Sequence, residues 1–333
     1  MKKAKVAILE VKDNGRSLEE VIKEALRLVN WKSRIHRGDT VIIKPNMGHP
    51  TYEPGVITSP EVLYHLVKLI RDRASEVIVG ESDGIRYSCD DAFKNTGIGE
   101  AALKAGAKVI NFSKEEKIEV KFDNSLFLRK IELPKILVES DSFITVPVIK
   151  THEVTTLTCS LKNQFGCIPD KHRILYHHHL NEVIVDLNML LRPKLSVVDG
   201  TIGMEGNGPI HGQKVHLNLV MAADDVVAAD ATVCRLIGFN PNQIKHLKLA
   251  AEKGLGTIEA KEIEILPTNN LPNKYKFKAP NPDLVTKLML LAYRSKTLTW
   301  LFFISPLFNF LYWGAWKFRN LRDHVKCYFY DSS

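Results

Sequence analysis

The sequence predicts an α/β protein with a mainly parallel central sheet flanked by helices and a basic, aromatic-rich C-terminal extension. Two observations favour this fold class. Short apolar runs of strand length alternate with segments of helical spacing, which is typical of a sheet covered by helices. Several of the apolar runs end in polar clusters, as expected where the carboxyl ends of parallel strands meet at one sheet edge.

The first part of the chain alternates strands and helices. In the helix predicted over 16–29, apolar residues recur at helical spacing, and Ser17 with Glu20 forms a capping box. Ser59 is the expected N-cap of a second helix over 60–73. Strands are expected over 5–11, 39–43, 76–80 and 108–112.

The second part continues this alternation. A hairpin turning at 123–124 is expected at the sheet edge, and a short helix or turn follows over 133–140. The apolar run 143–148 predicts a buried strand. Strand 195–199 precedes a loop over 200–209 that contains four glycines. The other expected elements are helices over 180–191, 224–236 and 242–254 and a strand over 215–222.

The C-terminal part differs in composition from the body. Residues 267–282 contain four prolines and predict a linker between an α/β domain over 1–266 and a tail over 283–333. The formal net charge is +8, and residues 272–333 hold ten Lys or Arg against three acids, so this part carries 10 − 3 = +7. A nucleic-acid enzyme carries its basic surface on the folded body, so we expect no nucleic-acid partner and a functionally separate tail.

Residues 297–316 of the tail hold three of the four tryptophans. Trp and Tyr beside flanking cations are typical of a membrane interface. Ser305, Pro306 and Asn309 interrupt a run that is barely long enough to span a bilayer. The sequence favours interfacial binding over packing on the core or a second subunit, and both over a true span.

The five cysteines form no C-x-x-C pair. They predict free thiols and no iron–sulfur cluster bound by a cysteine motif of this chain. The N-terminus becomes polar too soon for a signal peptide. The expected location is therefore the cytoplasm, with the tail at the inner face of the membrane.

The expected site is organised around residues 149–179. These 31 residues contain three lysines and five histidines and directly follow the predicted buried strand. Four strands end in polar clusters, at 44–46, 81–83, 150–152 and 199–201. One such cluster is most simply a turn, but four that meet at one edge favour a ligand site.

Each candidate residue has an expected role. Neighbouring lysines have lowered pKa values and can act as bases or nucleophiles. A histidine would be general acid or base with a carboxylate orienting it, and glycines would cradle an oxyanion or phosphate. The candidate catalytic residues are Lys150, His152, Lys162, Glu81 and Asp199; the candidate substrate-binding residues are Lys44, Asn46, Asn163, Lys171, His177, Glu205, Gly206, Asn207 and Gly208.

Simpler interpretations exist for each group. The lysines could be unrelated surface residues, and the glycine loop could be a flexible connection. The consecutive histidines 177–179 do not share a helix face, so at most two would hold one metal ion. Glu81, Asp83, Asp199 and His152 are further metal candidates, but no metal-ligand spacing is present.

These motifs resemble the domain of unknown function 362 family over residues 6–238. The strings K-T-H at 150–152, K-N-Q-F-G at 162–166 and M-E-G-N-G-P at 204–209 carry the resemblance. It implies a prokaryotic α/β protein, often joined to a ferredoxin-type domain whose cysteines this sequence lacks. It also implies a distant similarity in fold to the nickel-pincer lactate racemase group, whose cofactor is not carried over.

The sequence therefore favours an enzyme that binds an anionic small-molecule or lipid-linked substrate, with reaction class and cofactor unassigned. The alternative is a non-catalytic binding or carrier protein for a metal or iron–sulfur cluster that serves a redox partner. The expected partners are the anionic small molecule, a membrane surface and a ferredoxin-type protein.

Overall fold

The computed structural model describes residues 3–11, 15–268 and 275–305. The chain forms two compact units. The first consists of Met1–Lys171 and Asn181–Asn281, and the second of His172–Leu180 and Pro282–Ser333. The tail residues from 306 onward, including part of the predicted interfacial run, lie outside the described residues.

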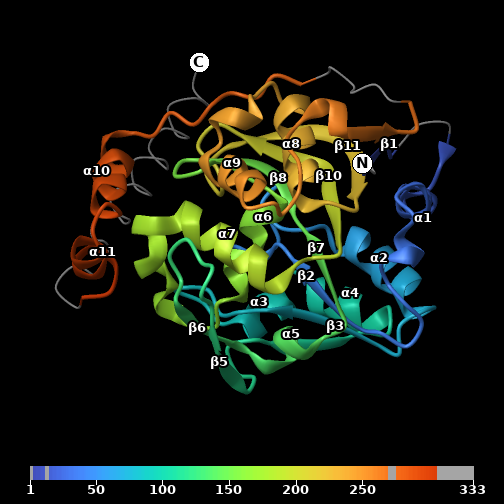
Figure 1. Ribbon diagram of the computed structural model, residues 1–333, viewed down its shortest axis with the longest axis horizontal. Helices are drawn as coiled ribbons and strands as arrows, with labels where there is room; N and C mark the ends of the chain where they lie inside the picture. Colours follow the sequence, from blue (N-terminus) through green and yellow to red (C-terminus); the bar gives the residue numbers. More distant parts are fainter. Residues whose placement is uncertain (1–2, 12–14, 269–274, 306–333) are drawn as a thin grey trace, which may run out of the picture. The chain divides into compact units, whose positions relative to one another are not determined.

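The first unit is built around a ten-stranded mixed sheet in the order β12-β1-β11-β10-β7-β2-β3-β4, with β8 pairing β10 and β9. Neighbouring strands are parallel except at β11 and β9. The strands are β1 Ala4–Glu10, β2 Thr40–Pro45, β3 Glu76–Glu81, β4 Lys108–Asn111, β7 Ser142–Val146, β8 Val148–His152, β9 Thr156–Thr158, β10 Leu195–Glu205, β11 Gln213–Ala223 and β12 Ile263–Leu266. In Figure 1 the labelled strands follow this order from β1 and β11 at the top, through β10, β7 and β2, to β3 below. The predicted α/β class with a mainly parallel sheet is confirmed.

Helices α1 to α9 lie between strands along the chain, and α10 and α11 follow the last strand. They are α1 Leu18–Leu28, α2 Pro60–Arg71, α3 Cys89–Asn95, α4 Ile98–Lys104, α5 Lys135–Glu139, α6 Ser160–Asn163, α7 Leu180–Leu191, α8 Val226–Leu236, α9 Lys245–Glu252, α10 Leu284–Ala292 and α11 Lys296–Phe303. The 3₁₀ turns are Trp31–Ser33, Gln164–Cys167, Lys171–His179, Pro241–Gln243 and Ala260–Glu262. The capping box of Ser17 and Glu20 is present at α1, and Pro60 opens α2.

Both faces of the central strands are buried. Val41, Ile43 and Val79 pack into a large cluster with α1, α2, α3 and α4. The alternate residues Ile42 and Ile78 pack on the opposite face with a smaller cluster near α5. Continuous apolar runs are the sequence signature of strands that are covered on both sides.

Two details differ from the sequence-based expectation. The hairpin of β5 (Lys117–Lys121) and β6 (Lys130–Pro134) forms a separate two-stranded sheet, because these strands pair with each other and not with the edge of the main sheet. Strand β10 continues to Glu205, through six of the ten residues that their glycines predicted as a loop. Gly203 fits there because a Cβ would lie 2.9 Å from the carbonyl oxygen of Ile149 and from Leu217 Cδ1.

Pro147 separates β7 from β8. A proline has no N–H to donate to a sheet ladder, and its carbonyl accepts the N–H of Asp199 at 2.8 Å. Beyond this point β10 pairs with β8 in place of β7. The break carries Lys150 and His152, which are buried on β8, to the carboxyl edge of the sheet.

The second unit contains two short capped helices. Asp283 accepts the N–H of Thr286 at the start of α10, and Ser295 accepts that of Leu298 at the start of α11. Thr299 of α11 donates its hydroxyl to the carbonyl of Ala292 at 3.1 Å, which ties the two helices together. In the described ranges no helix is both long enough and apolar enough to cross a bilayer.

Candidate functional site

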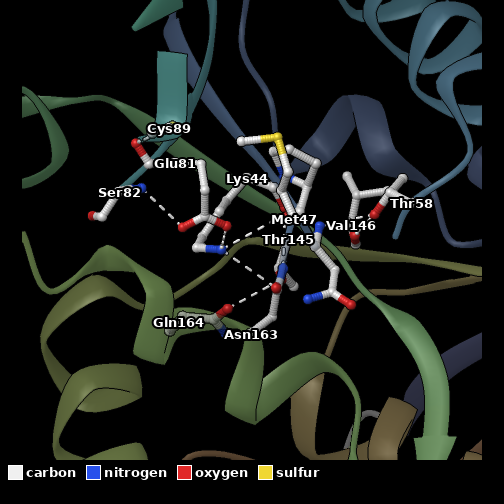
Figure 2. Close-up of polar contacts among 12 residues, drawn as sticks. Lys44, Met47, Thr58, Glu81, Ser82, Cys89, Thr145, Val146, Asn163 and Gln164 are labelled. Carbon is white, nitrogen blue, oxygen red and sulfur yellow. Dashed lines mark hydrogen bonds and ion pairs between the residues drawn. The ribbon is translucent and has the colours of Figure 1, made fainter. Parts of the chain in front are cut away.

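A buried ion pair lies where β2 and β3 end. Lys44 Nζ is 2.5 Å from Glu81 Oε2, and the two side chains are 1% and 6% exposed. Lys44 also donates to the carbonyl of Pro45 and to Asn163 Oδ1, at 3.1 and 3.4 Å. Figure 2 shows the ammonium between the Glu81 carboxylate and the Asn163 side chain. Because burial strips water from both charges, these added hydrogen bonds are needed to hold the pair.

Gly166 closes one side of this ion pair. A Cβ at this position would lie 2.5 Å from Glu81 Oε1 and 2.8 Å from Lys44 Nζ. Any larger residue would therefore push the two charged groups apart. The lack of space for a side chain thus explains why position 166, the end of the K-N-Q-F-G string, is a glycine.

Asn163 and Gln164 fix this string to the sheet. Asn163 Nδ2 donates to the Lys44 carbonyl at 3.1 Å and to Thr145 Oγ1 at 2.9 Å. The Thr145 hydroxyl donates to Gln164 Oε1, and Gln164 Nε2 donates to Asn188 on α7. Asn163, predicted to bind substrate, has its amide engaged within the protein.

Lys150 is fully buried, and two uncharged oxygens hold its amino group. Its Nζ donates to Asn46 Oδ1 at 2.5 Å and to the carbonyl of Val56 at 2.8 Å. Burial, followed by the charges of Lys162 and Lys44, lowers the pKa of Lys150 from its ordinary 10.5 to about 7. Two other predicted site residues, Lys44 and Lys162, are therefore close enough to act electrostatically on Lys150.

Asp230 on α8 anchors the start of α6, the short helix that carries Lys162. Its carboxylate accepts the N–H groups of Ser160 and Leu161 at 2.7 and 3.0 Å. Burial raises the pKa of Asp230 to about 6, although these hydrogen bonds oppose the rise. The carboxylate thus sets the position of Lys162 from a distant part of the sequence.

His246 on α9 is fully buried. Among the described residues neither of its ring nitrogens has a hydrogen-bond partner. Burial, and then the charge of Lys162, lower its pKa to about 3. A neutral imidazole therefore lies within electrostatic reach of Lys162.

The end of β8 contacts the glycine segment. His152 Nδ1 accepts the N–H of Val154 at 3.0 Å, so in a neutral ring Nε2 carries the proton. The Thr151 hydroxyl donates to the carbonyl of Gly206 at 2.7 Å. A Cβ on Gly208 would lie 2.1 Å from the Thr151 carbonyl oxygen, so this segment packs against the K-T-H string.

The polar groups of the glycine segment bind residues 278–281. Glu205 accepts the N–H of Lys278 at 2.9 Å, and Asn207 accepts that of Asn281 at 2.7 Å. The N–H of Gly206 donates to the carbonyl of Lys278, and the N–H of Gly208 to the carbonyl of Gly206. The predicted oxyanion cradle therefore holds its own chain in this structure.

Asp199, in the middle of β10, accepts hydrogen bonds from two backbone segments. It accepts the N–H of Ser59 at 2.7 Å and the N–H and hydroxyl of Thr201 at 3.0 and 2.6 Å. Burial raises the pKa of Asp199 against these hydrogen bonds. Its contacts tie β10 to the start of α2.

Asp83 and Lys171 meet near the end of β3. Lys171 Nζ is 3.3 Å from Asp83 Oδ2, with the lysine largely exposed. Burial acts to raise the pKa of Asp83, but hydrogen bonds from Cys89, Asn111 and Lys171 outweigh it, and the net pKa is lowered.

His177 belongs to the second unit. Its Nδ1 lies 3.0 Å from the carbonyl of Ile174, and its ring packs on Tyr293 at 4.6 Å between centroids. The described residues contain no group of three or more His, Cys, Asp or Glu side chains that could hold a metal ion.

Asp230 and His246 were not predicted from the sequence. Asp230 lies in α8, whose residues are nearly all buried, and His246 lies in α9; the sequence pattern of neither helix shows what these side chains contact. Asp230 belongs to none of the sequence motifs, and its hydrogen-bond partners are about 70 residues away in the chain. Ser82 is also buried beside Glu81, and its hydroxyl has no partner among the residues that the structure describes.

The protein is thus a mostly parallel α/β protein whose candidate site lies at the carboxyl ends of its strands, where buried lysines and carboxylates meet. The chain belongs to the domain of unknown function 362 family, whose profile matches residues 41–235, and the predicted resemblance is confirmed. It is 29% identical to thylakoid-associated protein sll1697 of Synechocystis sp. (strain ATCC 27184 / PCC 6803 / Kazusa) over 229 residues, which cover 66% of this chain and 68% of the relative.

Among solved structures, the lactate racemase apoprotein from Thermoanaerobacterium thermosaccharolyticum matches with a TM-score of 0.42 and 14% sequence identity. The match covers 76% of this chain and 57% of the racemase chain. This chain therefore spans less than two thirds of the length of that structure.

Proposed function

We propose that the protein is an enzyme that binds an anionic small-molecule substrate beside Lys150, Lys162 and His152. The observation that carries the proposal is the environment of Lys150, a fully buried ammonium whose two hydrogen-bond acceptors are uncharged. Groups with pKa values perturbed by burial and by specific neighbouring charges cluster at functional sites.

The charge balance around Lys150 supports an anionic ligand. Glu81 compensates Lys44 directly. Lys150 instead feels the repulsion of Lys162 and Lys44. An anion beside Lys150 would relieve this repulsion and raise the pKa of the ammonium again.

The same environment supports proton transfer. With a pKa of about 7, Lys150 is shared between its ammonium and amine forms near neutral pH, which suits a general base or a nucleophile. His152, with its proton on Nε2, would act as the acid. Asp230 would position Lys162 through the start of α6.

We also propose that the protein works at a membrane surface on the cytoplasmic side. The name of the Synechocystis relative, a thylakoid-associated protein, supports membrane association. The basic balance of residues 272–333 supports it independently, because anionic bilayers attract such segments.

The proposal is tested by calorimetric titration of the full-length protein with inorganic phosphate, pyrophosphate and citrate. Lys150→Ala and Lys162→Ala should each weaken binding of the preferred anion on the order of a hundredfold, within the range for losing one buried charged contact. Circular dichroism should show that both variants are folded. Lys117→Ala, which removes an exposed lysine on β5, is the control and should bind like wild type.

Two results would contradict the proposal. One is that both variants bind the anions as tightly as the wild type. The other is that anaerobically purified protein holds a stoichiometric metal or iron–sulfur cluster and binds none of the anions, which would support the carrier alternative.

A further inference from the structure

Helix α10 exposes a stripe of leucines. Leu284, Leu288 and Leu291 are 74%, 56% and 48% exposed. Their spacing places them on one face of the helix. In α11, Leu298, Trp300 and Phe302 are also exposed, at 41%, 47% and 39%. Six large apolar side chains within 19 residues form a concentration that monomeric soluble proteins rarely leave in water.

Two cations lie on the same stripe. Lys287 and Arg294, both exposed, follow Leu284 and Leu291 by three positions each. They line a shallow pocket of about 300 Å³ together with Leu290 and Leu291. Lys287 lies on α10 and Arg294 in the turn that follows it, and the pocket that both side chains line places the two cations close together.

The part of the second unit that the structure describes offers little negative charge to these cations. Across 172–180 and 282–305 the sequence has one acid, Asp283. Its carboxylate accepts the N–H of Thr286 at the start of α10. The surface is therefore both apolar and basic, a combination that matches an anionic bilayer and not a purely apolar protein groove.

We propose that the α10–α11 surface docks on an anionic phospholipid bilayer. Lipid phosphates would bind at Lys287 and Arg294, and the exposed leucines with Trp300 and Phe302 would enter the interfacial layer. This inference rests on the proposed membrane location and specifies its contact surface. It does not depend on the anion site at Lys150.

The experiment is co-sedimentation of the full-length protein with vesicles of phosphatidylglycerol and phosphatidylcholine, compared with phosphatidylcholine alone. The wild type should bind the anionic vesicles more tightly. Lys287→Gln combined with Arg294→Gln should weaken this binding about thirtyfold, since each basic residue near the surface contributes roughly a factor of five. Raising salt from about 0.1 M to about 1 M should remove most of the difference between wild type and this variant.

Leu288→Ser combined with Leu291→Ser should weaken binding at both salt concentrations, because apolar insertion does not depend on salt. Matched controls lie in the first unit. Lys117→Gln with Lys121→Gln removes two lysines from β5, and Leu103→Ser removes an apolar side chain that is 62% exposed on α4. Both controls should sediment like the wild type.

Equal binding of wild type and both double variants to anionic vesicles would show that the α10–α11 surface is not the docking surface. Membrane association would then depend on another part of the chain. No binding by the wild type would overturn the membrane location as well. Self-association of the wild type that Leu288→Ser with Leu291→Ser abolishes would identify a subunit interface instead. Anion titration at the Lys150 site should be unchanged in all these variants, which separates the two proposals.

Discussion

Replacing Lys150 with methionine should change how the stability of the protein depends on pH. Methionine has a similar length and no charge, so the variant keeps most of the packing on β8. The loss of the hydrogen bonds to Asn46 and Val56 lowers stability by an amount that does not vary with pH. The pH-dependent part of the difference therefore reports the ionisation of Lys150 alone.

The size of this effect follows from the lowered pKa. Burial and the neighbouring lysines lower the pKa of Lys150 from 10.5 to about 7. At about 1.4 kcal/mol for each pH unit, the difference of about 3.5 units amounts to about 5 kcal/mol. Between these two pH values the unfolded chain binds more protons than the folded protein, so the stability of the wild type rises with pH. Below pH 7 the full cost of the buried charge is present.

The assay is urea denaturation of both proteins at a series of pH values. From about pH 7 to about pH 9.5 the free energy of unfolding of the wild type should rise by about 3 kcal/mol relative to Lys150→Met. Lys117→Met controls for the removal of one positive charge from an exposed position on β5. If the difference in free energy of unfolding between wild type and Lys150→Met stays constant over this range, the pKa of Lys150 is not lowered by burial and by the neighbouring lysines.

Two further predictions concern neighbours of the site. Gly166→Ala should destabilise the protein by about 2 kcal/mol, because the new Cβ would lie 2.5 Å from Glu81 Oε1. Gly48→Ala is the control, since its Cβ would meet nothing nearer than Asn46 Nδ2 at 4.0 Å; equal melting temperatures of the two variants would contradict the steric account. His246→Leu should stabilise the protein at pH 7 by on the order of 1 kcal/mol, since both ring nitrogens lack a hydrogen-bond partner in the described ranges. The pKa of His246 in the folded protein, about 3, lies below the ordinary 6.5. The wild type should therefore lose stability relative to His246→Leu as pH falls below 6.5. Urea denaturation at pH 7 and pH 5 measures this, and an equal difference in free energy of unfolding between the two proteins at both pH values would contradict the prediction.

The sequence predicted those features that depend on local chemistry. The capping box of Ser17 and Glu20 and the proline that opens α2 both appear where expected. The polar ends of β2, β3 and β8 could be predicted to meet, because parallel strands bring their carboxyl ends to one edge. In the structure Lys44 contacts Glu81, and Lys150 contacts Asn46.

Features that depend on packing between distant segments could not be predicted in this way. Four glycines in ten residues indicate a loop, yet Gly203 lies in β10. Glycine is needed there because the carbonyl of Ile149 and the side chain of Leu217 leave no room for a Cβ. A glycine inside a strand often marks such a close approach. The role of Asp230 depends on where α8 meets α6, which no local pattern encodes.

In the proposed site an anion binds beside the buried Lys150 and raises its pKa. The most direct measurement is titration calorimetry of the wild type at about pH 7.5, with the preferred anion in two buffers of different ionisation enthalpy. Binding should take up a substantial fraction of one proton from solution, because Lys150 is largely neutral before binding and charged after it. This uptake should disappear in Lys150→Ala. Binding with no proton uptake, or with the same uptake in wild type and variant, would show that the anion does not bind beside Lys150.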